Sequence, residues 1–381
     1  IQGVLFPWLI TIWLAQPGER VGLGQMMAML PMLLLLLFGG AAADKRELRG
    51  HLLRLQAAIA LPSLALIFVI LTGTLGYWTV VAYAVAVSIV GAFVIPARDS
   101  ALTHVAEHSG IPLGRAITIA NATQYGSQIV GLTLGGFAAV VGPAPLLIAQ
   151  VAIVVLAVFA TSHIAQQPPH PREAAKATFR AAAREIGDGL REAFGSDRIR
   201  PVVSLMFGAS ILFMGVFMVL LPLLVRDVYG ASSGAIAAVN ICFMAGVVVG
   251  SVTLTVRRAI RRQGRTMMCS LAVSWLALIA LHFAPPLWAV YAIMFLWGSA
   301  SGVSMSASRG IVQEAAPRSH RARILSVYQL AQIGGAPIGA LLIGFVVGWV
   351  GVLDAMWLPV VTGALLWVVV LLFTPLWRIE R

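Results

Sequence analysis

The sequence predicts an all-α membrane protein in which twelve helices form two related six-helix bundles. Of the 381 residues, 60% are hydrophobic and only 10% are charged, which is too little polar surface for a soluble globular chain of this size. The mean hydropathy of +0.93 extends over the whole chain, which excludes a single anchor on a soluble domain. Transmembrane barrels are excluded because their strands alternate apolar and polar residues, whereas runs such as 29–38 and 360–373 are apolar on every side.

Apolar segments supply the second observation. Eleven of them are long enough to cross about 30 Å of hydrocarbon as helices: 21–40, 51–72, 77–97, 114–139, 144–164, 201–225, 232–255, 266–284, 288–307, 323–349 and 353–375. The stretch 1–15 is equally apolar but reaches only about 22 Å as a helix. We therefore expect the sequence to begin inside a twelfth helix.

The longest break in hydrophobicity divides the chain. It predicts an N-terminal bundle (1–164, with a truncated first helix), a cytoplasmic linker (165–200) and a C-terminal bundle (201–381). In the linker, Phe179, Ile186, Leu190 and Phe194 share one helical face and arginines lie beside it. This pattern predicts an amphipathic helix along the inner membrane surface; a plain surface linker is the alternative.

An internal repeat is the third observation. At an offset of 208 positions the second half matches the first at Arg115/Arg323, Thr118/Ser326, Gln124/Gln332, Gly126/Gly334, Gly131/Gly339, Gly136/Gly344 and Phe137/Phe345. Upstream, across a three-residue gap, Arg98 aligns with Arg309. Repeated halves with a substrate site where they meet are one way to build a secondary transporter.

Basic residues are distributed unequally between the two sides of the membrane. Of the 26 Lys and Arg, only Arg20 and Arg226 fall in loops on one side. Because cytoplasmic loops carry the excess of positive charge, we expect both termini inside a bacterial cell, with the chain in the inner membrane. The net charge of +12 is therefore an orientation signal and a contact for anionic lipids, and nucleic acid is not an expected partner.

The loop after the second span carries a family resemblance. Residues 39–49 read GGAAADKRELR, which resembles the loop between helices two and three of the major facilitator superfamily, although Glu47 and Leu48 stand where that family has a glycine and a basic residue. The resemblance covers essentially the whole chain and implies two six-helix halves that transport by alternating access. The stretches 96–98, 221–227 and 314–317 look most like bacterial siderophore and macrolide exporters.

Charged residues at the inner helix ends are candidates for gating. The resemblance implies that Asp44 latches the two halves in the outward-facing state, and an anion there can pair with an arginine or a helix N-terminus. Arg98 and Asp99, at the inner end of span four, are its expected neighbours. The alternative is that these are solvated loop charges. The predicted gating set is Asp44, Arg46, Arg49, Arg98, Asp99, Arg309 and Glu314.

Amides in the repeated spans are candidates for substrate binding. Burying several amides in hydrocarbon is costly unless they meet partners or water, so they either line a cavity or join helices as packing contacts. On span ten, Trp297 lies beside Gly298 and Gly302, which mark a face that lets another helix approach closely and favours packing. On span seven, Met214 belongs either to an adaptable apolar wall for a substrate or to the surface that faces lipid. The predicted substrate set is Asn121, Gln124, Tyr125, Gln128, Tyr328, Gln329, Gln332, Trp297 and Met214.

Several expected features are missing from the sequence. All fourteen carboxylates lie in loops or at helix ends. Three alternatives follow: a proton-coupling acid lies before residue 1, proton coupling uses Asp44, Asp99 or Glu314, or transport is not coupled to protons. No histidine or cysteine spacing predicts a metal site, and no cofactor is expected. An intramembrane enzyme would need a buried nucleophile, acid pair or metal site, and no such constellation is present.

The sequence thus predicts a monomeric exporter that moves an amphipathic or lipid-like small molecule, with proton antiport as its energy source. Gly131, Gly135 and Gly136 resemble the antiporter motif of drug exporters, but Leu132 replaces the expected proline. A lysophospholipid or lipid flippase of the same superfamily is the first alternative. A non-transporting receptor or scaffold is the second.

Overall fold

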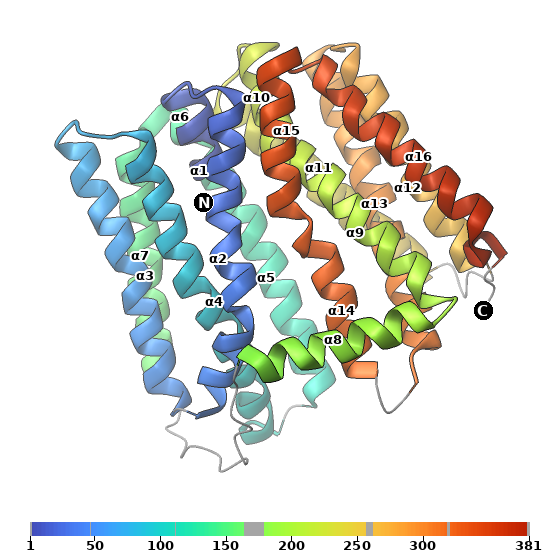
Figure 1. Ribbon diagram of the computed structural model, residues 1–381. Coiled ribbons are helices and arrows are strands. Elements are labelled where there is room, and N and C mark those ends of the chain that lie inside the picture. The colour runs from blue at the N-terminus through green and yellow to red at the C-terminus, as the bar shows by residue number, and fades with distance from the viewer. Residues whose placement is uncertain are drawn as a thin grey trace. The chain divides into compact units, whose positions relative to one another are not determined.

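The structure, a computed structural model, describes residues 2–45, 47–110, 112–163, 179–256, 262–317 and 321–378, and helices are the only regular secondary structure in these ranges (Figure 1). Contacts between residues divide the chain into two compact units. Unit 1 comprises Ile1–Gln16 and Met27–Ala181, and unit 2 comprises Pro17–Met26 and Ala182–Arg381. The boundary therefore falls inside one helix, α2 (Gly18–Lys45).

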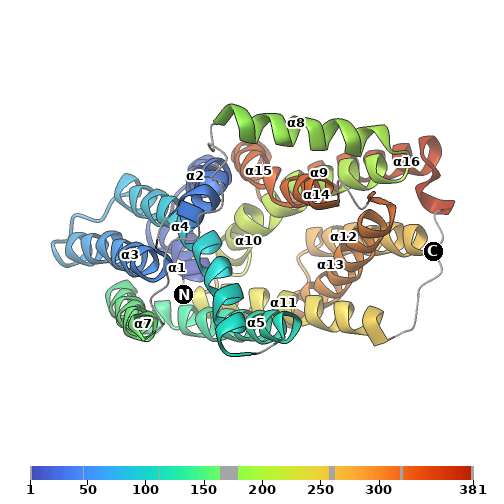
Figure 2. The ribbon, with the colours of Figure 1, turned by 90° about the horizontal axis from the view of Figure 1, so that it is seen from below.

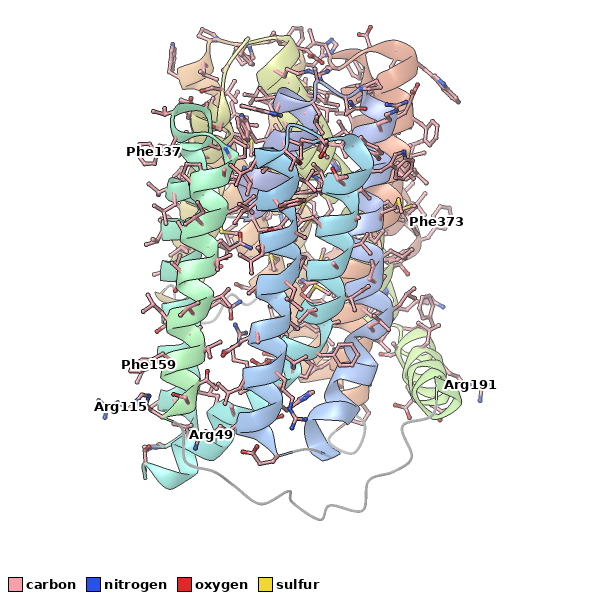
Figure 3. All side chains as sticks on the ribbon, turned by 90° about the vertical axis from the view of Figure 1, so that its left-hand side faces the viewer. Arg49, Arg115, Phe137, Phe159, Arg191 and Phe373 are labelled. Atoms are coloured by element: carbon pink, nitrogen blue, oxygen red, sulfur yellow. The ribbon has the colours of Figure 1, made fainter. Side chains whose placement is uncertain are left out.

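Unit 1 contains the first half of the helices. They are α1 (Gln2–Trp8), the π-helix η1 (Leu9–Trp13), most of α2, α3 (Leu48–Leu71), α4 (Tyr77–His108), α5 (Leu113–Gly136), α6 (Ala138–Val141) and α7 (Pro143–Ser162). α3 packs against both α4 and α7, and α1 packs against α5. In Figure 3, Arg49 and Arg115 lie at one end of this unit and Phe137 at the other.

Unit 2 contains the second half. Its helices are α8 (Phe179–Gly195, from Ala182), α9 (Ile199–Gly215), the π-helix η2 (Val216–Leu220), α10 (Leu221–Asp227), α11 (Ser233–Val256), α12 (Gln263–His282), α13 (Leu287–Ala315), α14 (Arg321–Gly334), α15 (Ala336–Val350), η3 (Asp354–Met356), α16 (Trp357–Phe373) and η4 (Pro375–Arg378). α9 contacts α13, α14, α15 and α16.

The predicted spans coincide with helices. Within the described ranges, nine helices are long and apolar enough to cross a membrane. α4 and α13 run past their predicted ends to His108 and Ala315, because helical backbone continues into the polar residues that follow the apolar run. The predicted split of the chain at 164 and 201 stays a prediction.

The internal repeat extends to unusual backbone conformations. Each π-helix follows the first α-helical segment of its half, at Leu9–Trp13 and at Val216–Leu220. Left-handed residues are also paired: Gly73 (φ 71°) corresponds to Ala284 (φ 46°), and Gly142 (φ 80°) to Gly351 (φ 85°). The two halves therefore share turn geometry as well as sequence.

Glycines bring helices of unit 2 into backbone contact. On α11 and α13, a Cβ atom on Gly246 would collide with the Phe295 carbonyl, and one on Gly302 with the Val247 carbonyl. Gly298 meets the Phe243 carbonyl in the same way. The sequence-based prediction that Gly298 and Gly302 allow close helix approach is confirmed, since only a residue without a side chain fits there.

The predicted linker helix forms α8, which runs crosswise to the long helices of unit 2 (Figures 1 and 2). Ala193 is buried in the unit's core, whereas Leu190 and Phe194 are each 44% exposed. The Phe179 and Ile186 side chains lie outside the described residues. Position on the membrane surface stays a prediction.

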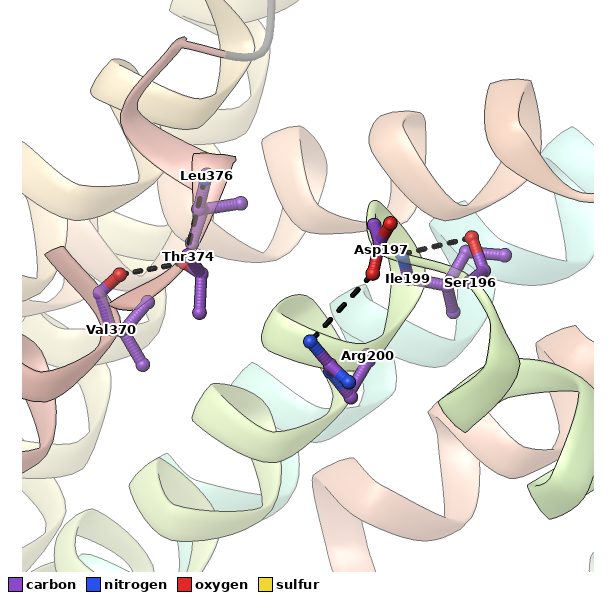
Figure 4. A network of polar contacts seen from close by, with 7 residues as sticks. All are labelled: Ser196, Asp197, Ile199, Arg200, Val370, Thr374 and Leu376. Carbon is purple, nitrogen blue, oxygen red and sulfur yellow. Dashed lines mark hydrogen bonds and ion pairs between the residues drawn. The ribbon is translucent and has the colours of Figure 1, made fainter. Parts of the chain in front are cut away.

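The turn from α8 into α9 is held by local contacts (Figure 4). Ser196 Oγ accepts a hydrogen bond from the Ile199 N–H at 3.4 Å, and Asp197 pairs with Arg200 at 3.7 Å. The first interaction satisfies a backbone N–H in the first turn of α9, and the second neutralises the charge of Arg200 in the same turn.

Candidate substrate-binding faces

One of the predicted amides of the second half, Gln332, joins a hydrogen-bond network around the buried Tyr328. Tyr328 is 1% exposed, and its Oη lies 2.7 Å from Ser308 Oγ on α13 and accepts from Gln332 Nε2 at 2.7 Å. Tyr328 also donates to the Met305 carbonyl at 3.3 Å. Residues 328 and 332 are one helical turn apart, which places the Gln332 amide beside Tyr328 on the same face of α14. The network fixes α14 to α13.

Accessible side chains also occur on α9, α13 and α14. Met214 on α9 is 36% exposed, Met305 on α13 is 47% exposed, and Gln329 on α14 is exposed. Phe207, two turns before Met214 on α9, reaches Gly334 of α14. These three helices contact one another. We call their accessible residues Met214, Met305 and Gln329 the methionine face.

Trp297 on α13 is buried against aromatic residues of α9 and α11. It is 1% exposed, and its ring centroid is 5.7 Å from that of Phe213 and 5.5 Å from that of Phe243. In this conformation Trp297 and Tyr328 therefore support α13 and α14 from inside, while Met214 and Gln329 of the predicted substrate set reach the surface.

The predicted amides of the first half are arranged differently. Gln124 and Gln128 on α5 are exposed, and Gln124 Oε1 accepts a hydrogen bond from Arg98 at 3.2 Å. Arg98 also pairs with Asp99 at 3.4 Å. A predicted substrate residue thus contacts a predicted gating residue. The side chains of Asn121 and Tyr125 lie outside the described residues.

The remaining gating residues divide between the two units. In unit 1, Leu52 near the start of α3 packs with Ala97 and Ala101 of α4, which brings the part of α3 that carries Arg49 close to the part of α4 that carries Arg98. In unit 2, Glu314 accepts a hydrogen bond from Gln263 Nε2 at 3.2 Å, and Arg309 is exposed. The side chains of Asp44 and Arg46 lie outside the described residues, so the latch stays a prediction.

Comparison with known proteins identifies the family. The profile of the family described as "Transmembrane secretion effector", a branch of the major facilitator superfamily, matches residues 1–380. The chain belongs to this family. It is therefore a secondary transporter and not an enzyme. A search of curated proteins gave no significant match.

Solved structures show the fold of this transporter. The crystal structure of the nucleoside transporter NupG is similar with a TM-score of 0.77 and 13% identity, over 97% of this chain and 95% of that one. The D-xylose-proton symporter is similar with a TM-score of 0.69 and 16% identity, over 98% and 95%. The predicted twelve-helix major facilitator fold is confirmed.

A polar interface inside unit 1 of the transporter escaped the sequence analysis. Gln56 Nε2 donates to Thr161 Oγ1 at 3.0 Å, and Gln150 Nε2 donates to Ser63 Oγ at 3.2 Å and to Tyr83 Oη at 3.1 Å. Gln56 and Ser63 are seven residues apart and so share one face of α3. That spacing was the available signal for a polar contact between α3 and α7.

The first residues of α2 pack tightly on α15 within unit 2 of the transporter. A Cβ atom on Gly22 would meet the Ala340 carbonyl at 2.5 Å, and one on Gly344 would meet the Gly22 Cα at 2.7 Å. Gln25 Nε2 donates to the Met218 carbonyl at 3.2 Å. We call this contact the α2–α15 glycine contact. A cavity of about 540 Å³ lies beside it, lined by Arg226, Asp227 and Asp354 among others.

No group of three metal-ligating side chains occurs among the residues that the structure describes. Cys242 and Cys269 are both free.

Proposed function

We propose that this secondary transporter exports an amphipathic or lipid-like small molecule, and that the methionine face is its binding wall in the second half. The observation that carries the proposal is the exposure of Met214, Met305 and Gln329 around a rigid Tyr328 network. Methionine side chains are flexible and polarizable, so they adapt to apolar ligands of varied shape. An amide supplies hydrogen bonds without demanding a charged partner.

The position of the carboxylates supports neutral or amphipathic cargo. On the described parts of α9, α13 and α14 that form the methionine face, the charged groups are at the ends of the helices, as with Arg309 and Glu314. A sugar or phosphate would need several polar or cationic groups to replace its hydration. The methionine face offers apolar surface with one amide, which suits a greasy molecule with a small polar part.

Alternating access is supported by the α2–α15 glycine contact. α2 continues into unit 1, yet its first residues belong to unit 2 through this contact. A transporter that exposes its site to both sides in turn must form and release such contacts. We therefore include the release of the Gly18 and Gly22 contacts among the steps of alternating access, on the side that the charge distribution predicts to be outer.

Outward direction and proton antiport form the finer part of the proposal. The family's description as a secretion effector and the sequence resemblance to exporters favour export from the cytoplasm. We place the protein in a bacterial inner membrane as a monomer with both termini inside. Asp44, Asp99 and Glu314 are the candidate coupling acids from the sequence.

The test is counterflow of a labelled amphipathic compound in proteoliposomes, with Met305→Lys and Met305→Leu as a matched pair. A lysine ammonium at this exposed position would lose its hydration wherever an apolar ligand covers the wall, which is costly, so Met305→Lys should lose most of the transport while Met305→Leu keeps it. Equal rates for the two variants would remove Met305 from the binding wall.

A second assay separates export from lipid flipping. A labelled lysophospholipid in one leaflet reports flipping, whereas a water-soluble amphipathic cation reports release into the lumen. Transport of the lysophospholipid alone would favour the flippase. If the wild type transported none of the compounds, the remaining hypothesis would be a non-transporting receptor or scaffold.

A further inference from the structure

The cavity beside the α2–α15 glycine contact has no role in the proposed function so far. It measures about 540 Å³ and is formed by the start of α2, the end of α10 and the segment from α15 to η3, all within unit 2. Figure 1 shows the ends of α10 and α15 at the same end of this unit. Sites for small organic molecules usually measure about 300–1,000 Å³, so the cavity has room for one.

The wall of this cavity is mostly aliphatic. Val228 follows α10 and is 36% exposed, Val347 lies on α15, and Leu353 precedes η3. Gly18 of α2 packs closely on this wall, because a Cβ atom there would lie 2.9 Å from the Val347 side chain. An aliphatic wall favours the apolar part of a ligand, since it removes that part from water.

All the acidic and basic residues of the predicted outer side belong to unit 2, and three of them line the cavity. Two are basic and three are acidic: Glu19, Arg20, Arg226, Asp227 and Asp354. The predicted outer loops of unit 1, 72–76 and 137–142, contain no charged residue. The outer side is therefore net acidic, although the whole protein has a net charge of +12.

The arginine of the cavity is engaged by the residue next to it. Arg226 Nη2 donates to Asp227 Oδ2 at 2.9 Å, and Arg226 Nε donates to Asp227 Oδ1. A bidentate pair of arginine and carboxylate is a strong charge-assisted contact, so the two charges largely neutralise each other. Arg226 is the one cationic residue among the described residues that line the cavity, and its pairing disfavours an anionic ligand.

Two further carboxylates give the cavity its sign. Asp354, the first residue of η3, lines the cavity and is exposed. The Glu19 carboxylate lies against Gly348, another lining residue, because a Cβ atom there would collide with Glu19 Oε1. Within the described parts of the chain, neither carboxylate has an ion-pair partner. A cleft that carries charge of one sign between apolar walls raises the local concentration of ions of the other sign.

We propose that this cavity binds an amphipathic organic cation, with Asp354 and Glu19 attracting its ammonium group and the aliphatic wall covering its apolar part. The site rests on the proposed function for the identity of this cation as cargo, and it deepens that function by giving the cargo a positive charge. The cavity lies beside the α2–α15 glycine contact, so the cation is held on the side to which export is proposed to release it.

The binding experiment is equilibrium dialysis of radiolabelled benzyltrimethylammonium against the purified full chain in non-ionic detergent at low salt, with detergent alone as the reference. Asp354→Asn and Glu19→Gln should each weaken binding by about 2–5-fold, as for other contacts between exposed charges, and added salt should weaken binding by the wild type. Asp197→Asn, which changes an exposed carboxylate between α8 and α9, is the control and should bind like the wild type. Unchanged affinity in both Asp354→Asn and Glu19→Gln would overturn the proposal.

A pair of ligands tests the sign of the charge without any substitution. Benzenesulfonate has an aromatic ring with the opposite charge and should show no saturable binding; equal binding of benzenesulfonate and benzyltrimethylammonium would refute an acidic site. Val228→Trp fills the cavity and keeps every charge, so it should abolish binding of the cation. Full binding by folded Val228→Trp would place the cation elsewhere.

Counterflow of the same cation in proteoliposomes separates the site from the proposed function. Asp354→Asn should raise the cation concentration that gives half-maximal counterflow by about 2–5-fold, and Asp197→Asn should not. If the wild type binds the cation in dialysis but does not transport it, the site stands and the cation is not cargo. If the wild type transports the cation, and Asp354→Asn and Glu19→Gln change neither dialysis nor counterflow, the site fails and the proposed function stands.

Discussion

α4 of unit 1 and α13 of unit 2 occupy corresponding places in the repeat, but their glycines have different surroundings. Gly91 on α4 aligns with Gly302 on α13 at the same offset that pairs Arg98 with Arg309. A Cβ atom on Gly91 would meet nothing within 4 Å, whereas one on Gly302 would collide with the Val247 carbonyl. The repeat therefore preserves the residue and not the contact. Unit 2 uses glycine for backbone packing, and unit 1 joins α3 to α7 through amides.

The sharpest test of this difference is the pair Gly302→Ala and Gly91→Ala. Overpacking at Gly302 should lower stability by about 1–3 kcal/mol. At Gly91 the same change should raise stability by up to about 1 kcal/mol, because alanine is the better helix former. Opposite signs in unfolding experiments on the purified protein in detergent would support the comparison, and equal shifts would contradict it.

A second contrast concerns the repeat-related amides Gln124 and Gln332. Gln332→Leu removes the donor to buried Tyr328, and the loss should cost about 1–2 kcal/mol of stability. Gln124→Leu breaks an exposed contact with Arg98, so stability should hold while transport falls. The two variants are compared by thermal unfolding and by counterflow. A stability loss in Gln124→Leu equal to that in Gln332→Leu would mean that both amides serve packing.

The sequence was sufficient for the fold and insufficient for the sites. Hydropathy and the repeat predicted every long helix, because membrane spans are set by length and apolar character alone. The environment of each amide was not predictable: Gln124 and Gln332 align, yet one is exposed and the other meets Tyr328, where the first half has Ala120. Side-chain neighbours depend on helix rotation by a fraction of a turn, which hydropathy does not specify.

Glu47 illustrates the same limit. It stood out only as a departure from the family's loop pattern, and its structural role follows from where α3 begins. Helix ends are the least certain part of a prediction, so the sequence pattern assigned Glu47 to a loop although it is the N-cap of α3.

A smaller effect is expected at Tyr229, which lies between the helices of unit 2. Its hydroxyl donates to the Pro285 carbonyl, so Tyr229→Phe should cost about 1 kcal/mol. Burial raises the pKa of the Tyr229 phenol above its usual value of 10.0. The folded state thus keeps the phenol proton to higher pH than the unfolded state does. The stability that the protonated phenol contributes is complete below pH 10 and is lost as the pH rises beyond it. The difference in unfolding free energy between the wild type and Tyr229→Phe should therefore become smaller at alkaline pH. A difference that does not change with pH would contradict a role for the Tyr229 hydroxyl as a hydrogen-bond donor.

The smallest effect should come from the amide contact of unit 1. Gln56→Leu removes the hydrogen bond to Thr161 but also removes the buried Gln56 Oε1, which has no partner among the described residues. Interhelical hydrogen bonds in membranes average about 0.6 kcal/mol, and the loss of an unsatisfied oxygen offsets part of that. Gln56→Leu should therefore change unfolding stability by less than Tyr229→Phe does. If Gln56→Leu lowered the unfolding stability as much as Gly302→Ala does, unit 1 would depend on its amides as strongly as unit 2 depends on its glycines. The two units would then differ only in the chemistry of their helix contacts.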